Sequence, residues 1–216
     1  MSLRYALLAL LTAGPATGYD AAKRFSGSVG HVWHAPDSQI YPELRRMEKD
    51  ELVEGEPVRW GPHSTKTQYR ITETGLSTFR KWMNTPLDHT PERDAHHMQA
   101  AYFEWAEPER AREILRTHIE YYTTQIAMLT EVQKGIVDRT DPAIIRRLTH
   151  YPPEKHARII AYKAHTYEGM ISRSRSEIVW AREGLELIDD LPEPTSTDAT
   201  QLDSISAAPT LTGETT

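Results

Sequence analysis

Residues 37–53 read DSQIYPELRRMEKDELV, and this stretch decides the fold of the chain. Ile40, Leu44 and Met47 recur at helical spacing, which predicts an amphipathic helix with one buried face. Asp37 or Ser38 is placed to cap its start. The opposite face can donate hydrogen bonds to phosphates or base edges through Gln39, Tyr41, Arg45, Arg46 and Lys49. We therefore predict a helix that reads DNA.

Two shorter helices are predicted before this stretch. A leucine-rich run ends at Gly14-Pro15 and gives the first helix. Thr17 can cap the second helix, in which we expect Tyr19 to face inward. Three helices in this order are typical of a helix-turn-helix domain.

A β-hairpin and a further helix are predicted after it. Residues 53–59 and 66–71 have the character of short strands, and the turn-rich segment 60–65 joins them. Thr72 then starts a fourth helix. The hairpin would be the wing of a winged helix-turn-helix, and we place this DNA-binding domain at residues 1–84.

The rest of the chain is predicted to be helical. Residues 85–93 contain two prolines and form a linker, and residues 94–191 follow as a helical domain. Asp94, Pro108 and Asp141-Pro142 stand where helices begin, and Pro152-Pro153 opens the longest helix. The predicted fold class is therefore mainly α, with a coiled-coil-like carboxy-terminal dimerisation domain.

The longest predicted helix carries a heptad seam. Apolar or small residues alternate four and three apart for four heptads, at Ile160, Ala164, Tyr167, Ile171, Ser174, Ile178, Ala181, Leu185 and Ile188. A repeat sustained for this length is typical of a coiled coil. We predict that the chain forms a homodimer through Ile160, Tyr167, Ile171, Ile178 and Leu185.

The last segment, residues 192–216, is rich in Thr, Ser and Pro and has no aromatic or basic residue. Such a composition buries too little apolar surface to offset the entropy of ordering it. We expect a disordered tail.

Charge is distributed unevenly along the chain. The 25 Lys and Arg against 31 Asp and Glu give a net charge of −6, which by itself disfavours nucleic acid. Residues 1–85, however, hold 11 basic and 9 acidic residues, so the predicted DNA-binding domain is the basic part. Local charge governs phosphate binding.

Several other function classes are disfavoured. The chain has no cysteine and no run of apolar residues long enough to span a membrane, which fits a cytoplasmic protein. We find no phosphate loop or nucleophile motif and expect no enzyme and no cofactor. His31 and His34 could share a face, but no carboxylate completes a metal set with them. His96 and His97 are adjacent and point in different directions on a helix, so we expect no metal site.

Several segments together resemble the PadR family of transcriptional regulators, in particular its branch with a long helical carboxy-terminal domain typified by a virulence-gene activator. The likeness covers most of residues 1–85 in the right order. Its pieces are Met1-Ser2-Leu3, Ala16-Thr17-Gly18-Tyr19-Asp20, Lys23, Phe25-Ser26, Trp33, Gln39-Ile40-Tyr41-Pro42-Glu43-Leu44, Met47, Leu52-Val53 and Tyr69-Arg70-Ile71-Thr72-Glu73-Thr74-Gly75.

The resemblance implies a homodimer on a dyad-symmetric operator, with the third helix of each protomer in a major groove. The positions where the family meets DNA are Tyr19, Ser38, Gln39, Tyr41, Arg45 and Arg46. Two positions depart from the family. Glu51 stands where many members have glycine, and Lys66 is the only Lys or Arg between Arg59 and Arg70, so it is the wing's candidate contact.

We therefore interpret the chain as a sequence-specific DNA-binding regulator, with repression favoured over activation. A small aromatic effector is a further candidate partner, because some relatives bind flat aromatic compounds. Its pocket could be lined by Trp33, Trp60, Trp82, Trp105 and Trp180, although core and interface packing is the favoured interpretation for at least three of them. The alternative is a helical ligand-sensing or interaction module that has lost DNA binding, which the net acidity and the weakly basic wing favour.

Overall fold

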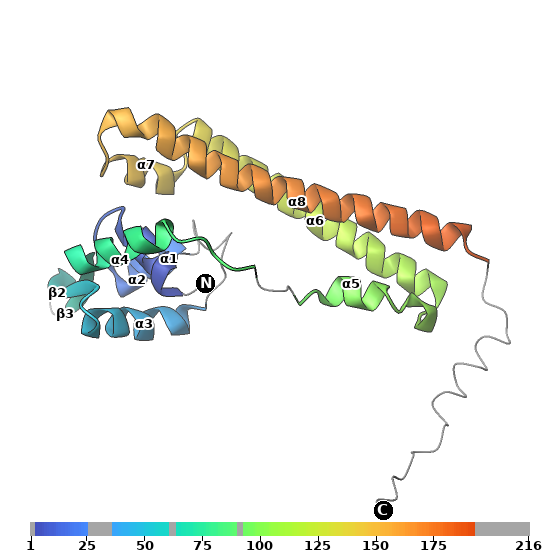
Figure 1. Ribbon diagram of the computed structural model, residues 1–216, viewed down its shortest axis with the longest axis horizontal. Coiled ribbons are helices and arrows are strands. Elements are labelled where there is room, and N and C mark those ends of the chain that lie inside the picture. Colours follow the sequence, from blue (N-terminus) through green and yellow to red (C-terminus); the bar gives the residue numbers. More distant parts are fainter. Residues whose placement is uncertain (1–2, 26–35, 61–63, 90–92, 193–216) are drawn as a thin grey trace, which may run out of the picture. The chain divides into compact units, whose positions relative to one another are not determined.

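The computed structural model describes residues 3–25, 36–60, 64–89 and 93–192 (Figure 1). The chain forms two compact units, each built from two separate segments. One unit contains residues 1–90 and 132–166, and the other contains residues 91–131 and 167–216. The possible ligands His31 and His34, Trp33 and nearly all of the predicted tail lie outside the described residues.

The first unit contains the winged helix-turn-helix. Its helices are α1 (Leu3–Leu11), α2 (Gly18–Arg24), α3 (Asp37–Lys49) and α4 (Glu73–Met83). The strands β2 (Val53–Trp60) and β3 (Ser64–Ile71) form the antiparallel hairpin, with Gly55 opposite Tyr69. This arrangement confirms the predicted fold class of the amino-terminal part.

A third strand was not anticipated from the sequence. Strand β1 (Ala16–Thr17) pairs antiparallel with β3 and gives the strand order β1-β3-β2. A pair of residues is too short to show an alternating pattern of its own. The strand ties the start of α2 to the wing.

The core of the winged helix is built from the residues with helical periodicity. Ile40, Leu44 and Met47 are fully buried and pack with Leu7 and Phe25. The expectation that Tyr19 faces inward was wrong, since its side chain is 54% exposed. Gly18 occupies the buried position beside it, at the first turn of α2.

The side-chain caps follow the sequence at the starts of α2 and α4. The side chain of Thr17 accepts a hydrogen bond from Asp20 N, and that of Thr72 accepts one from Gly75 N. Helix α3 differs: it begins at Asp37 itself, and Pro36 is the N-cap without a side-chain hydrogen bond. Neither Asp37 nor Ser38 therefore occupies the capping position.

The remaining elements are helical. They are α5 (Ala95–Ala100), η2 (Phe103–Trp105), α6 (Pro108–Val137), α7 (Pro142–Leu148), η3 (Pro153–Lys155) and α8 (His156–Asp190). Asp94 and Asp141 cap α5 and α7 as predicted. The opening turn at Pro153 is a short 3-10 helix, from which α8 continues.

Helices α6 and α8 pack antiparallel within each unit. In the second unit, Arg112 Nε donates to Asp189 Oδ1 at 2.9 Å. In the first unit, Gln133 Nε2 donates to Ala164 O at 3.1 Å. None of the helices in the described ranges is both long and apolar enough to cross a bilayer.

Candidate nucleic-acid interface

Helix α3 presents three distinct faces, because each residue turns the helix by about 100°. Ile40, Leu44 and Met47 point into the core. Directly opposite lie Ser38, Pro42, Arg45 and Lys49, all of which are exposed. The two flanks between these faces contact different neighbours, so each of them constrains its side chains differently.

Arg45 and Lys49 are the cations of the outer face. They are one turn apart, and no ion pair joins either of them to a carboxylate among the described residues. Two exposed and unneutralised cations on one helix face suit contact with phosphates or with acceptors in the major groove.

The flank toward α1 is an ion-pair network. Arg4 Nε lies 2.9 Å from Glu43 Oε1, and Arg4 Nη1 lies 2.7 Å from Asp50 Oδ2. Arg46 Nη1 lies 3.1 Å from Glu43 Oε2. The hydrogen bond with Glu43 is the first reason why the pKa of Arg4 is raised. Arg46 thus shares a carboxylate with Arg4, while Gln39 on the same flank is exposed.

The flank toward α2 is closely packed. The ring of Tyr41 lies against Gly18, where an added Cβ would come within 2.5 Å of Tyr41 Cε1. Tyr41 remains 42% exposed. The tyrosine therefore packs against α2 and still reaches the surface.

The wing residue Lys66 lies between two aromatic rings. Its Nζ is 3.4 Å from the ring centroid of Trp60 and 5.1 Å from that of Tyr19. The structure thus brings Tyr19 and Lys66 together, and adds Trp60, which is 48% exposed. A cation over aromatic faces is held in place and retains its charge.

The end of α3 is a Schellman motif. Leu52 N donates to Met47 O at 2.9 Å, and Glu51 N donates to Glu48 O at 3.0 Å. Glu51 has φ +58°, a left-handed conformation that glycine adopts without strain. The helix therefore ends as a glycine-terminated helix would, although the residue is glutamate.

The predicted dimerisation residues are not equivalent in the structure. Tyr167 and Ile171 are buried within the single chain, whereas Ile160, Ile178 and Leu185 are half-buried. Helix α6 covers part of this seam, as the contact expected between a Cβ at Gly184 and Leu115 illustrates. Self-association through the seam stays a prediction.

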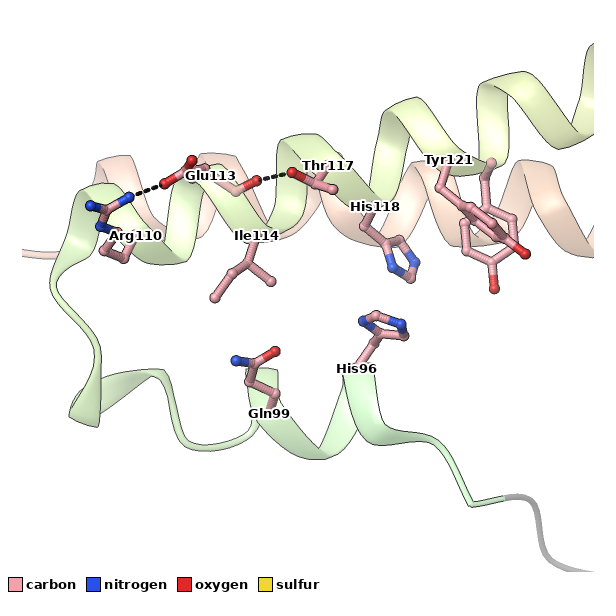
Figure 2. Close-up of a pocket in the computed structure, with 9 residues that line it drawn as sticks. His96, Gln99, Arg110, Glu113, Ile114, Thr117, His118 and Tyr121 are labelled. Carbon is pink, nitrogen blue, oxygen red and sulfur yellow. Dashed lines mark hydrogen bonds and ion pairs between the residues drawn. The ribbon is translucent and has the colours of Figure 1, made fainter.

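A pocket with a volume of 510 Å³ lies between α5 and α6 in the second unit (Figure 2). His96 and Gln99 on α5 point toward Ile114 and His118 on α6 (Figure 2). The lining residues are His96, Gln99, Arg110, Glu113, Ile114, Thr117, His118, Tyr121 and Tyr122.

Two lining residues of this pocket, His118 and Tyr122, belong to an aromatic cluster. The buried ring of His118 lies 4.7 Å from the ring of Tyr122 and 5.2 Å from that of Trp180, measured between centroids. His118 Nε2 is 3.2 Å from Glu177 Oε2. Burial, and then the charge of Glu177, raises the pKa of Tyr122 and keeps its hydroxyl protonated.

The family model that matches the chain is that of the transcriptional regulator PadR-like family, over residues 7–81. The match lies within the predicted DNA-binding domain. The negative transcriptional regulator PadR of Bacillus subtilis is 22% identical over 189 residues, or 87% of this chain and 97% of PadR. The probable transcriptional regulator Rv1176c of Mycobacterium tuberculosis is 34% identical over 90 residues, or 42% of this chain and 48% of that relative.

Several solved structures share the fold of this chain. Bacillus subtilis PadR in complex with operator DNA has a TM-score of 0.69 at 19% identity, covering 86% of this chain and 98% of PadR. The same protein in complex with p-coumaric acid gives 0.64 at 20% identity, with 88% and 96% covered. The Vibrio cholerae virulence activator AphA gives 0.61 at 25% identity, with 87% and 98% covered.

These findings confirm the family resemblance and the fold class. The homologues are transcriptional regulators, in agreement with the expectation that the chain is not an enzyme. Sequence reasoning overlooked Arg4 and considered Trp60 only for an effector pocket, because their roles come from contacts with residues on other elements. It also overlooked His118 and Glu177, which lie 59 residues apart.

Proposed function

We propose that the PadR-like chain binds specific DNA as a transcriptional regulator and inserts α3 into a major groove. The observation that carries this proposal is the outer face of α3, where Arg45 and Lys49 are exposed opposite a fully buried apolar face. The shared fold of PadR bound to operator DNA supports the same use of the domain.

The proposed DNA contacts differ in how neighbouring residues hold them. Ser38, Gln39, Tyr41, Arg45, Arg46 and Lys49 on α3, Tyr19 on α2 and Lys66 on β3 are the proposed contacts. Arg46 remains engaged with Glu43, so we assign base or phosphate contact first to Arg45 and Lys49. Lys66 is positioned by Trp60 and contributes charge from the wing.

Fluorescence anisotropy with the DNA upstream of the chain's own coding region, at two salt concentrations, tests the proposal. Specific binding should exceed binding to a scrambled duplex of equal length by at least 1000-fold, roughly the lower limit for such proteins. Affinity should fall with salt in proportion to the number of phosphates contacted. Equal and weak binding to both duplexes would favour the alternative, a ligand-sensing or interaction module without DNA binding.

We further propose a homodimer on a dyad-symmetric operator that acts by repression in the cytoplasm. Two copies of α3 related by a twofold axis can read half-sites one helical turn apart. The half-buried residues Ile178 and Leu185 of α8 leave apolar surface for a second copy. Repression requires only that the dimer occlude the promoter, and PadR, which matches most of this chain, is a negative regulator.

A small aromatic effector is proposed for the pocket between α5 and α6. The aromatic cluster around His118 favours a planar ring, and PadR has been solved with p-coumaric acid. Adding p-coumaric acid to the DNA complex should release DNA from the wild type. Ile114→Trp fills the pocket and should abolish release, while Ile145→Trp on the exposed face of α7 should not. No release from the wild type would contradict this ligand class.

A further inference from the structure

Four cationic side chains converge on a small pocket in the first unit. Arg24 comes from α2, Arg146 and Arg147 come from α7, and Lys163 comes from α8. The pocket has a volume of 80 Å³. This is several times the roughly 10–15 Å³ that one water requires. It is well below the roughly 300 Å³ at which pockets for drug-sized ligands begin.

The arginines are fixed by neutral oxygen atoms. Arg147 Nη1 donates to Thr12 Oγ1 at 3.1 Å and to Ala9 O at 3.4 Å. Arg24 Nη1 donates to Pro15 O at 3.0 Å and to Gly14 O at 3.4 Å. These hydrogen bonds orient both guanidinium groups, and those of Arg147 do so without neutralising its charge.

The cations exceed the acidic groups that face them. Asp20 attracts Arg24, and Asp141 attracts Lys163. In the described part of the chain, no ion pair joins Arg146, Arg147 or Lys163 to a carboxylate. Burial, and then the charge of Arg147, lowers the pKa of Lys163, and burial followed by Arg146 lowers that of Arg24. Like charges are thus held together at an energetic cost.

The geometry points to a binding site for a small oxyanion, a phosphate or carboxylate group, in this pocket. The alanines Ala9, Ala13 and Ala143 line it, and their short side chains leave the space that the cations surround. Charge-assisted hydrogen bonds from guanidinium and ammonium groups are the strongest that such an anion can accept. An anion here contacts α1 and α2 of the PadR-like domain together with α7 and α8.

The test measures thermal unfolding of the full chain in sodium phosphate, sodium acetate and sodium chloride at equal ionic strength. Phosphate or acetate should raise Tm above the chloride value, by about 3–5 °C for each tenfold excess over its Kd. The acetate arm distinguishes a carboxylate site from a phosphate site. Lys163→Met should remove the rise, whereas Lys155→Met, with the same change of charge at an exposed position, should preserve it.

Arg146→Gln provides a second variant in case Lys163→Met does not fold, and it should weaken the anion effect in the same way. Isothermal titration with inorganic phosphate should show one site per chain in the wild type and none in either pocket variant. The proposal fails if the oxyanions stabilise the wild type no more than chloride does, or if both pocket variants retain the effect. Loss of DNA affinity in Lys163→Met without any anion effect would assign these cations to the DNA backbone and also overturn the proposal.

Discussion

At the scale of single residues, the sequence identifies the cations of α3 but not their partners. Arg45, Arg46 and Lys49 look alike in the sequence, yet only Arg46 shares Glu43 with Arg4. The pair of Arg46 with Glu43 is a local i,i+3 contact, whereas the contact of Glu43 with Arg4 joins residues 39 positions apart, which local spacing cannot reveal. The structure therefore distinguishes, by their ion pairs, three cations that the sequence does not separate.

The combined change Arg45→Ala and Arg46→Ala should lower operator affinity at least tenfold at moderate salt. Each lost base contact costs about 1–3 kcal/mol, and each lost phosphate contact lowers the salt dependence by about one ion. Arginine and alanine both favour helices, so the fold should persist. The combined change Arg80→Ala and Lys81→Ala, on the exposed part of α4, is the control with the same change of charge. Unchanged affinity in the folded double variant would refute α3 as the reading helix.

Glu51→Gly should stabilise the domain by about 1 kcal/mol, because the left-handed conformation of Glu51 strains any residue with a Cβ. Glu51→Ala removes the same side-chain charge but keeps the Cβ. The difference between the two variants in urea unfolding therefore isolates the backbone effect. Equal stability of the two variants would mean that position 51 stores no strain.

At the scale of elements, local signals predicted most boundaries. Thr17, Thr72, Asp94 and Asp141 all cap helices through their own side chains, since a cap requires only a short-range contact. The unforeseen β1 has a different cause. It depends on the pairing of Ala16 with Tyr69, which nearby residues do not encode.

Thr72 links the first turn of α4 to Glu51, and it tests whether a local cap stabilises the start of a helix. Its Oγ1 accepts from Gly75 N at 3.0 Å and donates to Glu51 O at 2.7 Å. Thr72→Ala should therefore destabilise the domain by about 1–2 kcal/mol, whereas Thr72→Ser should keep both hydrogen bonds. Thermal unfolding of both variants measures the difference. A Thr72→Ala variant as stable as the wild type would show that α4 does not depend on this cap.

At the scale of the whole molecule, the heptad repeat identified an apolar face of α8 but not the helix that covers it. Tyr167 and Ile171 are buried within one chain, so their periodicity reflects at least partly the packing of α8 in its own protomer. An alternating pattern is the same whether the covering helix comes from the same chain or from a second copy.

Substitutions at Leu185 and Leu187 distinguish a seam covered by the same chain from a seam that joins two copies. Leu185 lies on the seam and is half-buried, while Leu187 is on the same helix and 59% exposed. If the seam joins two protomers, Leu185→Asp should give monomers in light scattering and Leu187→Asp should remain dimeric, because charge in an apolar interface is strongly unfavourable. Circular dichroism should confirm that both variants are helical. A helical, dimeric Leu185→Asp variant would place the interface elsewhere.

The contact between Gly18 and Tyr41 couples the effects of substitutions at two positions that are distant in the sequence. The methyl group of Gly18→Ala would collide with the Tyr41 ring and displace it from its place beside α2. A buried substitution would thereby change the proposed DNA surface. We expect weaker operator binding from this change alone, but no further weakening from it in a Tyr41→Ser background, where the ring is absent. Such epistasis, measured by a double-mutant cycle on DNA affinity, would appear as an interaction between sites 23 positions apart in the printed sequence. Independent, additive effects would show that the ring can move without consequence.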